Sequence, residues 1–275
     1  MHEPTELIIE AGHAERHYWR DLWRYRELFY FFAWKDILVR YKQTVVGVAW
    51  AVIRPLLLMI VFTFVFKRVM NLPDDGVPYQ LTAYVGILAW TFFSMSLQES
   101  GTSLVGNANL ISKIYFPRLV IPAAAVITAL LDFLVAALLL FFLFAWFHRA
   151  PSIHIFALPI FVALAFAAAM GGGLWLSALM VRYRDIRFVI PFIVQFGLYV
   201  SPVFFNTAHL PASWRVWYSM NPVVGVIDGF RWAILGGPNE IYVPGMLMSV
   251  AVTVLLIFTG VGYFRKTERT FADII

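Results

Sequence analysis

Six long apolar stretches constrain this chain more than any other feature of its sequence. A helix needs roughly 20 apolar residues to cross the hydrocarbon core of a membrane, at about 1.5 Å per residue. Because the chain is 61% hydrophobic and only 13% charged, it lacks the polar residues that would cover a soluble domain. The sequence therefore predicts an all-α integral membrane protein with six transmembrane helices. The six stretches are residues 45–66, 80–97, 119–147, 155–181, 188–205 and 243–264.

The basic residues predict how these helices are oriented. An even number of spans places both ends of the chain on one side of the membrane. Lysine and arginine concentrate in the end segments and in every second connection, which the positive-inside rule assigns to the cytoplasm. Residues 1–43 are rich in charge and contain no short apolar core followed by small residues, so we expect no cleaved signal and a mature chain that starts at Met1. Both termini are predicted to be cytoplasmic.

Composition also argues against several classes of function. Cysteine is absent and the six histidines are scattered, so neither disulfide chemistry nor a metal site is predicted. The net charge of +5 fits connections that face an anionic membrane leaflet better than it fits nucleic-acid binding.

Three segments do not fit plain spans and loops. Residues 16–42 mix aromatic and basic residues at helical spacing, which predicts an amphipathic helix in the membrane interface. Residues 103–122 form an amphipathic connection that is too long for a turn. Residues 201–238 contain apolar pieces too short to cross, which predicts short re-entrant helices on the outer side, between spans five and six. The predicted organisation is a cytoplasmic segment, 1–43, and a permease domain, 44–275.

Four motifs stand in order along the chain: RYKQTVVGVAWAVIRPLL (40–57), NANLISKIYFPRLVIP (107–122), RYRDIRFVIPFIVQ (182–195), and SPVFF followed by NPVVGVIDGFRWAILG (201–236). Together they resemble the membrane subunits of ATP-binding-cassette exporters for bacterial polysaccharides. The resemblance covers about residues 16–270.

The resemblance implies a homodimer of six-helix subunits in the bacterial cytoplasmic (inner) membrane, enclosing a polymer channel above two separate ATP-binding subunits. ATP and Mg²⁺ would bind those partners, with no cofactor on this chain and no catalysis by it. The implied cargo is a lipid-linked polysaccharide, O-antigen-like or capsular, with teichoic acid or another glycolipid as the alternative. In agreement, the chain lacks the phosphate-binding pattern G-x-x-x-x-G-K-[ST].

Two charged residues lie inside predicted spans. Arg54 falls about ten residues into the first charge-free stretch, or roughly 15 Å by helical rise, where a cation facing lipid would cost about 2.5 kcal/mol or more. Either Arg54 reaches headgroups or pairs with a buried carboxylate such as Asp132, or it faces a hydrated channel and contacts the cargo or its lipid-linked diphosphate. Pro55 suits a helix kink at this entry. For Asp132, a pairing or interface role is favoured over a proton relay.

The remaining candidate residues follow from the predicted transport. Aromatic rings give sugars weak, displaceable contacts, but aromatic belts and helix packing use the same residues. Residues 107–118 are the first choice for contact with the ATP-binding subunit, and the helix RYRELFYFFAWKDILVRYK, residues 24–42, is the second. Asp228 and Arg231, three residues apart, predict a local ion pair. The candidates are Trp50, Arg54, Phe62, Phe196, Tyr199 and Phe204 for the channel; Asn107, Lys113, Tyr115, Pro117 and Arg118, then Asp36 and Arg40, for coupling; and Asn221, Pro222, Asp228 and Arg231 for an outer gate.

Two rival functions use the same residues differently. A proton-coupled secondary transporter would use Asp132 and Arg54, although no inverted repeat relates the two halves of the chain. A membrane acyl- or glycosyltransferase would use His148, His154 or His209, but the outer segments show no acid paired with a histidine.

Overall fold

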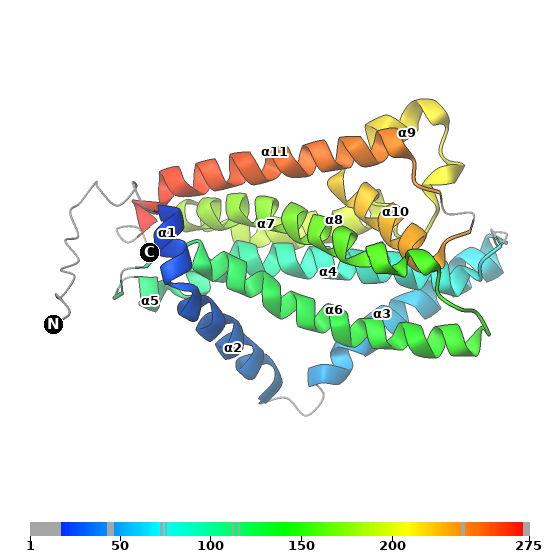
Figure 1. The fold of residues 1–275 in the computed structure, drawn as a ribbon, viewed down its shortest axis with the longest axis horizontal. Helices are drawn as coiled ribbons and strands as arrows, with labels where there is room; N and C mark the ends of the chain where they lie inside the picture. Colours follow the sequence, from blue (N-terminus) through cyan, green and yellow to red (C-terminus); the bar gives the residue numbers. More distant parts are fainter. Residues whose placement is uncertain are drawn as a thin grey trace.

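The computed structural model describes residues 18–42, 47–71, 74, 76–111, 113–114, 116–237 and 240–271, and all regular structure within them is helical. The helices form an elongated bundle (Figure 1). In chain order they are α1 (Tyr18–Arg24), α2 (Arg26–Lys42), α3 (Gly47–Thr63) continuing as η1 (Phe64–Val69), α4 (Tyr79–Gly106), α5 (Ala108–Ile111), α6 (Val120–Trp146), η2 (Ile153–Ala157), α7 (Leu158–Arg182), α8 (Ile186–Val200), η3 (Thr207–His209), α9 (Ala212–Tyr218), α10 (Pro222–Leu235) and α11 (Val243–Glu268).

Five helices within the described residues are long and apolar enough to cross a membrane. The fifth predicted span, residues 188–205, corresponds to α8, whose 15 residues rise only about 22 Å. That rise is shorter than the roughly 30 Å hydrocarbon core. The five helices are Ala49–Val69, Tyr79–Gly106, Val120–Trp146, Ile153–Arg182 and Val243–Glu268.

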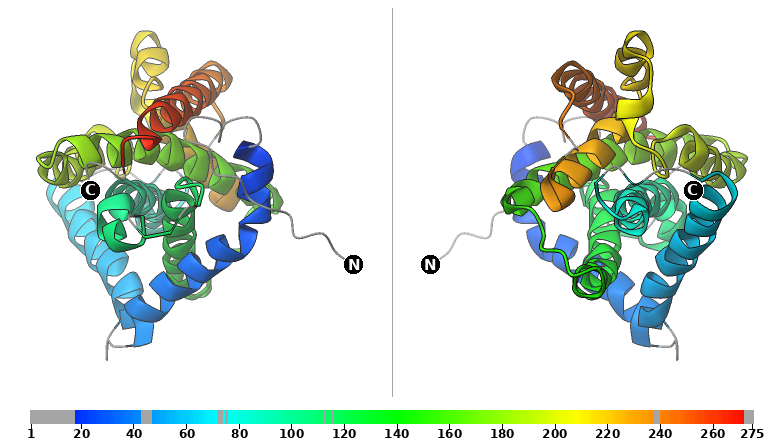
Figure 2. Two further views of the ribbon diagram at one scale, coloured as in Figure 1. Left: turned by 90° about the vertical axis from the view of Figure 1, so that its left-hand side faces the viewer. Right: turned by 90° about the vertical axis from the view of Figure 1, so that its right-hand side faces the viewer.

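Helix α4 is the centre of the bundle, and α3, α6, α7 and α10 pack around it (Figures 1 and 2). Small residues permit this close packing, as expected in a membrane, where there is little hydrophobic drive to bring helices together. Gly173 of α7 lies against Ser100 of α4, and Gly260 of α11 lies against the backbone of Gly171 in α7. These contacts make α4, α7 and α11 a rigid stack.

A second, smaller cluster of buried apolar residues lies at the end of the bundle where α2 begins. Phe32 of α2 packs there with Phe116 from the α4–α6 connection, and Phe264 of α11 packs with Phe271. This cluster joins the first helices, the connection and the end of α11 into one packed unit.

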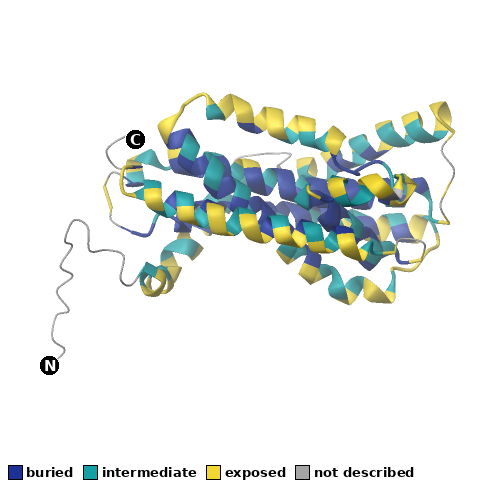
Figure 3. Cartoon of the chain, turned by 90° about the horizontal axis from the view of Figure 1, so that it is seen from above, coloured by how far each residue is buried: buried dark blue, intermediate teal, exposed yellow. Residues whose placement is uncertain are grey.

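The first helices differ in detail from the single amphipathic helix predicted for residues 16–42. The described part forms two helices that meet at Tyr25, and α2 crosses α6 obliquely (Figure 1). Exposed side chains, including Trp34, Leu38 and Val39 of α2, lie on outward-facing surfaces of the helices, and Figure 3 shows the same pattern along the bundle.

Helices extend into both of the irregular segments. Helix α4 extends to Gly106, so the connection to α6 is shorter than the predicted 103–122 segment. On the opposite end of the bundle, the pieces VVGVI and WAILG belong to one helix, α10, which is packed against α4, α7 and α11.

Candidate functional site

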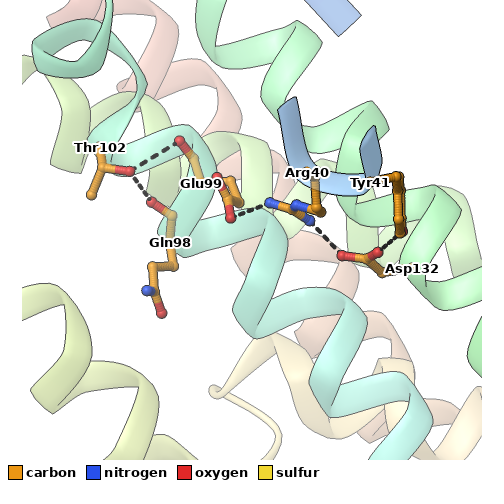
Figure 4. A network of polar contacts seen from close by, with 6 residues as sticks. All are labelled: Arg40, Tyr41, Gln98, Glu99, Thr102 and Asp132. Atoms are coloured by element: carbon orange, nitrogen blue, oxygen red, sulfur yellow. Dashed lines mark hydrogen bonds and ion pairs between the residues drawn. The ribbon is translucent and has the colours of Figure 1, made fainter. Parts of the chain in front are cut away.

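Four polar side chains form an ion cluster where α2 meets α4 and α6 (Figure 4). Asp132 of α6 is only 5% exposed, and its two carboxylate oxygens accept hydrogen bonds from Arg40 and from the hydroxyl of Tyr41. The Arg40 guanidinium also pairs with Glu99 of α4. One arginine at the end of α2 therefore bridges two acids on two long helices.

The electrostatics of this ion cluster keep Arg40 charged. Burial by itself lowers the pKa of Arg40, but Glu99 and Asp132 outweigh burial and raise it. Burial and the hydrogen bond to Asp132 raise the pKa of Tyr41 above its usual value, so Tyr41 remains a hydrogen-bond donor.

A cavity of about 310 Å³ opens beside the ion cluster. Its lining residues straddle the middle of α4 and the middle of α6, and its other wall is the start of α3. Arg40, Glu99 and Asp132 line it, together with Trp50 and Arg54 of α3.

Arg54 is the second cation of this cavity. Its guanidinium lies 5.9 Å from the centre of the Trp50 ring, which is within cation–π range. Asp132 is paired with Arg40, and among the described residues no carboxylate pairs with Arg54. The cavity thus presents an arginine without a counter-anion, an arrangement suited to an anionic ligand.

Pro55 lies inside α3, which continues through it to Thr63. Because proline has no amide hydrogen, the helix lacks the bond that this residue would donate to the carbonyl of Ala51. Ala51 itself lines the cavity.

The predicted channel aromatics fall into three places. Trp50 lies at the cavity. Phe196 and Tyr199 lie on the exposed side of α8. Phe204, by contrast, is buried, with its ring stacked on Phe62 of α3 at a centroid distance of 3.4 Å.

The predicted coupling segment is held at both ends. Asn107 accepts a hydrogen bond from Lys35 of α2 at 2.7 Å, and the backbone amide of Arg118 donates to Glu268 of α11 at 2.8 Å. Between them Lys113 is exposed and Pro117 is buried, whereas Tyr115 lies outside the described residues. Asp36 pairs with its neighbour Lys35 at 3.3 Å.

Asp228 and Arg231 lie close enough to attract one another electrostatically, as their spacing predicts, but their hydrogen bonds go elsewhere. Both side chains instead contact the turn that follows α8. Asp228 accepts a hydrogen bond from Thr207 at 2.7 Å. Arg231, only 1% exposed, donates to the carbonyls of Val203 at 2.8 Å and Phe205 at 2.7 Å. Asp228 and Arg231 of α10 therefore hold the segment that follows α8. The buried carbonyls of that segment need hydrogen-bond donors, which Arg231 supplies.

The other two outer-gate candidates form the start of α10. The Asn221 side chain accepts from the amide of Val223 at 3.1 Å, an N-terminal cap, and donates to Ser201 at 2.9 Å. Pro222 occupies the first helical turn, where its missing amide costs nothing.

Sequence reasoning missed two members of the ion cluster, Glu99 and Tyr41. Glu99 was placed just beyond the second predicted span, which ended at residue 97, although α4 extends to Gly106. Glu99 lies only two residues beyond the predicted end of that span, and this position was the signal that could have identified it as part of the same helix.

These features define a class: a multi-span helical membrane protein with a charged cavity between its helices. The family model described as ABC-2 type transporter matches residues 27–235. The chain therefore belongs to the ABC-2 type transporter family.

Curated relatives match nearly the whole chain. It is 29% identical over 250 residues to the O-antigen export system permease protein RfbA of Klebsiella pneumoniae, covering 88% of this chain and 92% of the relative. It is 24% identical over 258 residues to the protein of the same name from Myxococcus xanthus, covering 93% and 98%. It is 25% identical over 245 residues to the polysialic acid transport protein KpsM of Escherichia coli, covering 86% and 91%.

Proposed function

We propose that this chain is the transmembrane subunit of an ATP-driven exporter that moves a lipid-linked polysaccharide, O-antigen-like or capsular, across the bacterial cytoplasmic membrane. The observation that carries the proposal is the near full-length match to relatives named as O-antigen export permeases and a polysialic acid transport protein. Export of teichoic acid or another glycolipid is the alternative cargo within the same mechanism.

In the proposed assembly two copies of the chain face each other and two separate ATP-binding subunits bind ATP and Mg²⁺. Helix α8 is apolar and mostly exposed in the single chain, and α3 is apolar and only partly buried, so lipid or a second copy must cover them. Helix α8 and the 201–206 turn together form the fifth of the six crossings. Both termini are then cytoplasmic, as the basic residues indicate.

The α4–α6 connection is the proposed contact with the ATP-binding subunit. Lys113 and Ile114 are exposed there, while Asn107 and Arg118 anchor the two ends to α2 and α11. A short exposed segment held at both ends can transmit force to the helices that flank it.

Replacing residues 107–118 with a Gly/Ser linker tests this contact and the exporter assignment together. The chain is co-expressed with candidate ATP-binding subunits and reconstituted in nanodiscs, and ATP hydrolysis is measured with and without the permease. We expect the unaltered permease to associate stably and change the rate of hydrolysis, and the linker version to lose that effect. Movement of a solute by a proton gradient alone, with no ATPase bound, would contradict the proposal and favour a proton-coupled carrier.

The cavity is the proposed site for the anionic link between lipid and sugar chain. Arg54 supplies a positive charge without an acidic partner among the described residues, and Trp50 supplies a ring beside it. A diphosphate is the class of anion that a planar guanidinium binds well.

The Arg54→Gln variant should therefore export lipid-linked glycan at least about tenfold more slowly, because one charge-assisted contact is worth roughly 1.5–3 kcal/mol. The export rate of Arg54→Lys should lie between those of Arg54→Gln and the unaltered protein, since a lysine keeps the charge but loses the bidentate geometry. Export into inverted vesicles, normalised to protein, measures both. Arg184→Gln, an exposed arginine in the turn after α7, is the control, and equal losses in all three variants would exclude a specific role for Arg54.

A further inference from the structure

Helix α2 contacts both the α4–α6 connection and the ion cluster. At the connection, the Phe32 ring packs on Phe116 at a centroid distance of 5.7 Å, and Lys35 donates to Asn107. Five residues later on the same helix, Arg40 pairs with Glu99 and Asp132. The two sets of contacts are about 7.5 Å apart along the helix, so a displacement at one is felt at the other.

Helix α2 packs against α6 but buries few of its residues completely. Of its 17 residues only Phe32 and Ala33 are buried, whereas α4 buries most of its length. A helix with so little buried surface moves at a lower cost than the stack of α4, α7 and α11. Helix α2 is thus the movable element at this site, and α4 and α6 are the fixed ones.

The position of Arg40 sets the charge of the cavity. With Arg40 in place, its charge and that of Arg54 balance Glu99 and Asp132. Without Arg40, two carboxylates face Arg54 and the cavity becomes net negative. An anion is tolerated in the first state and repelled in the second.

We propose that Arg40 is a positioning residue that α2 withdraws from the cavity when the α4–α6 connection moves, which switches the site from accepting an anion to expelling it. This inference rests on the proposed function, because the movement comes from the ATP-binding subunit and the anion is the phosphate-class link of the cargo. The present structure is the accepting state, with Arg40 on both acids.

A cysteine placed in the cavity reports its charge directly, and the chain has no native cysteine to interfere. Met95 lines the cavity, and Thr91 gives a second reporter position on the same wall. In the assembled complex, Met95→Cys is modified by an anionic or a cationic methanethiosulfonate. The ratio of the two rates reports local potential and does not require transport.

We expect ATP binding to a hydrolysis-deficient partner to lower the anionic-to-cationic rate ratio about tenfold, the effect of one unit of charge on reagents of opposite sign at a partly hydrated site. Arg40→Gln should give the low ratio with and without nucleotide, and Glu99→Gln should raise it. In Lys35→Met/Phe32→Leu the response to ATP should shrink. Phe156→Cys, exposed on η2, should show no dependence on Arg40.

The complex could assemble and hydrolyse ATP while the rate ratio at both reporter positions stays the same with and without ATP. In that case Arg40 stays in place throughout and the proposed switch is wrong, although the exporter assignment stands. If no ATP-binding subunit assembles with the chain, the proposed function fails and the switch fails with it.

Discussion

Replacing Arg231 with methionine should remove most of the folded protein from the membrane. Methionine keeps the apolar bulk of the side chain but leaves the carbonyls of Val203 and Phe205 without donors. Asp228 also loses the positive charge of Arg231 nearby. Breaking a buried charged contact of this kind costs about 3–5 kcal/mol, a large part of the stability of an ordinary domain. Monodisperse protein recovered in detergent, and its midpoint of thermal unfolding, measure the loss.

Two further variants separate this contact from a general effect of losing an arginine. Arg149 also donates to a backbone carbonyl, that of Gly76 at 3.0 Å, but at an exposed position, so Arg149→Met should change stability by less than about 1 kcal/mol. Gly86→Ala approaches the same contact from α4, where a Cβ would collide with the Val203 carbonyl and the Arg231 side chain. Normal stability in both Arg231→Met and Gly86→Ala would show that the turn is not held in this way.

Asp132→Leu should be the second most damaging change. It removes the acceptor of Arg40 and Tyr41 inside the bundle and takes one of the two acids from Arg40. We expect a loss of about 3 kcal/mol in unfolding free energy. Denaturant titration of the purified protein, followed by tryptophan fluorescence, measures it.

A double variant tests whether the stability lost in Asp132→Leu comes from the positive charge of Arg40, which no longer has Asp132 beside it. Asp132→Leu/Arg40→Met removes both charges, so it should be more stable than Asp132→Leu alone, because an apolar replacement of a whole pair is often tolerated. Asp185→Asn, an exposed acid before α8, should stay within about 0.5 kcal/mol of the unaltered protein. A double variant that is simply the sum of its two single losses would argue against a direct Arg40–Asp132 interaction.

The predictions from sequence succeeded where one segment alone determines the outcome. Five of the six predicted spans correspond to helices able to cross a membrane, because hydropathy over about 20 residues depends on no partner. Residues 201–238 were likewise predicted to contain short helices, and α9 and α10 lie there. The prediction for residues 103–122 fell short, since a packed α4 continues beyond its apolar part through Ser100 and Ser103 to Gly106.

The pairing of charges needed the tertiary structure. Arg54 was a predicted partner of Asp132 because both were identified inside spans, yet Arg40, from outside the spans, takes that place. Asp228 and Arg231 have the spacing of a helical pair but both hold the segment after α8. In both cases the packing brings a residue that is distant in sequence within reach of a buried polar group, which sequence position alone does not predict.

The sequence by itself determined that this chain is a helical membrane protein and where most of its helices run, because lipid requires each segment to satisfy its own backbone and to be apolar along its length. Only the tertiary structure decided which charges meet. A charge inside a bundle is stable beside whichever opposite charge or carbonyl the packing brings within reach, and that packing is set by α4, by the glycines that let α7 and α11 approach one another, and by the oblique path of α2.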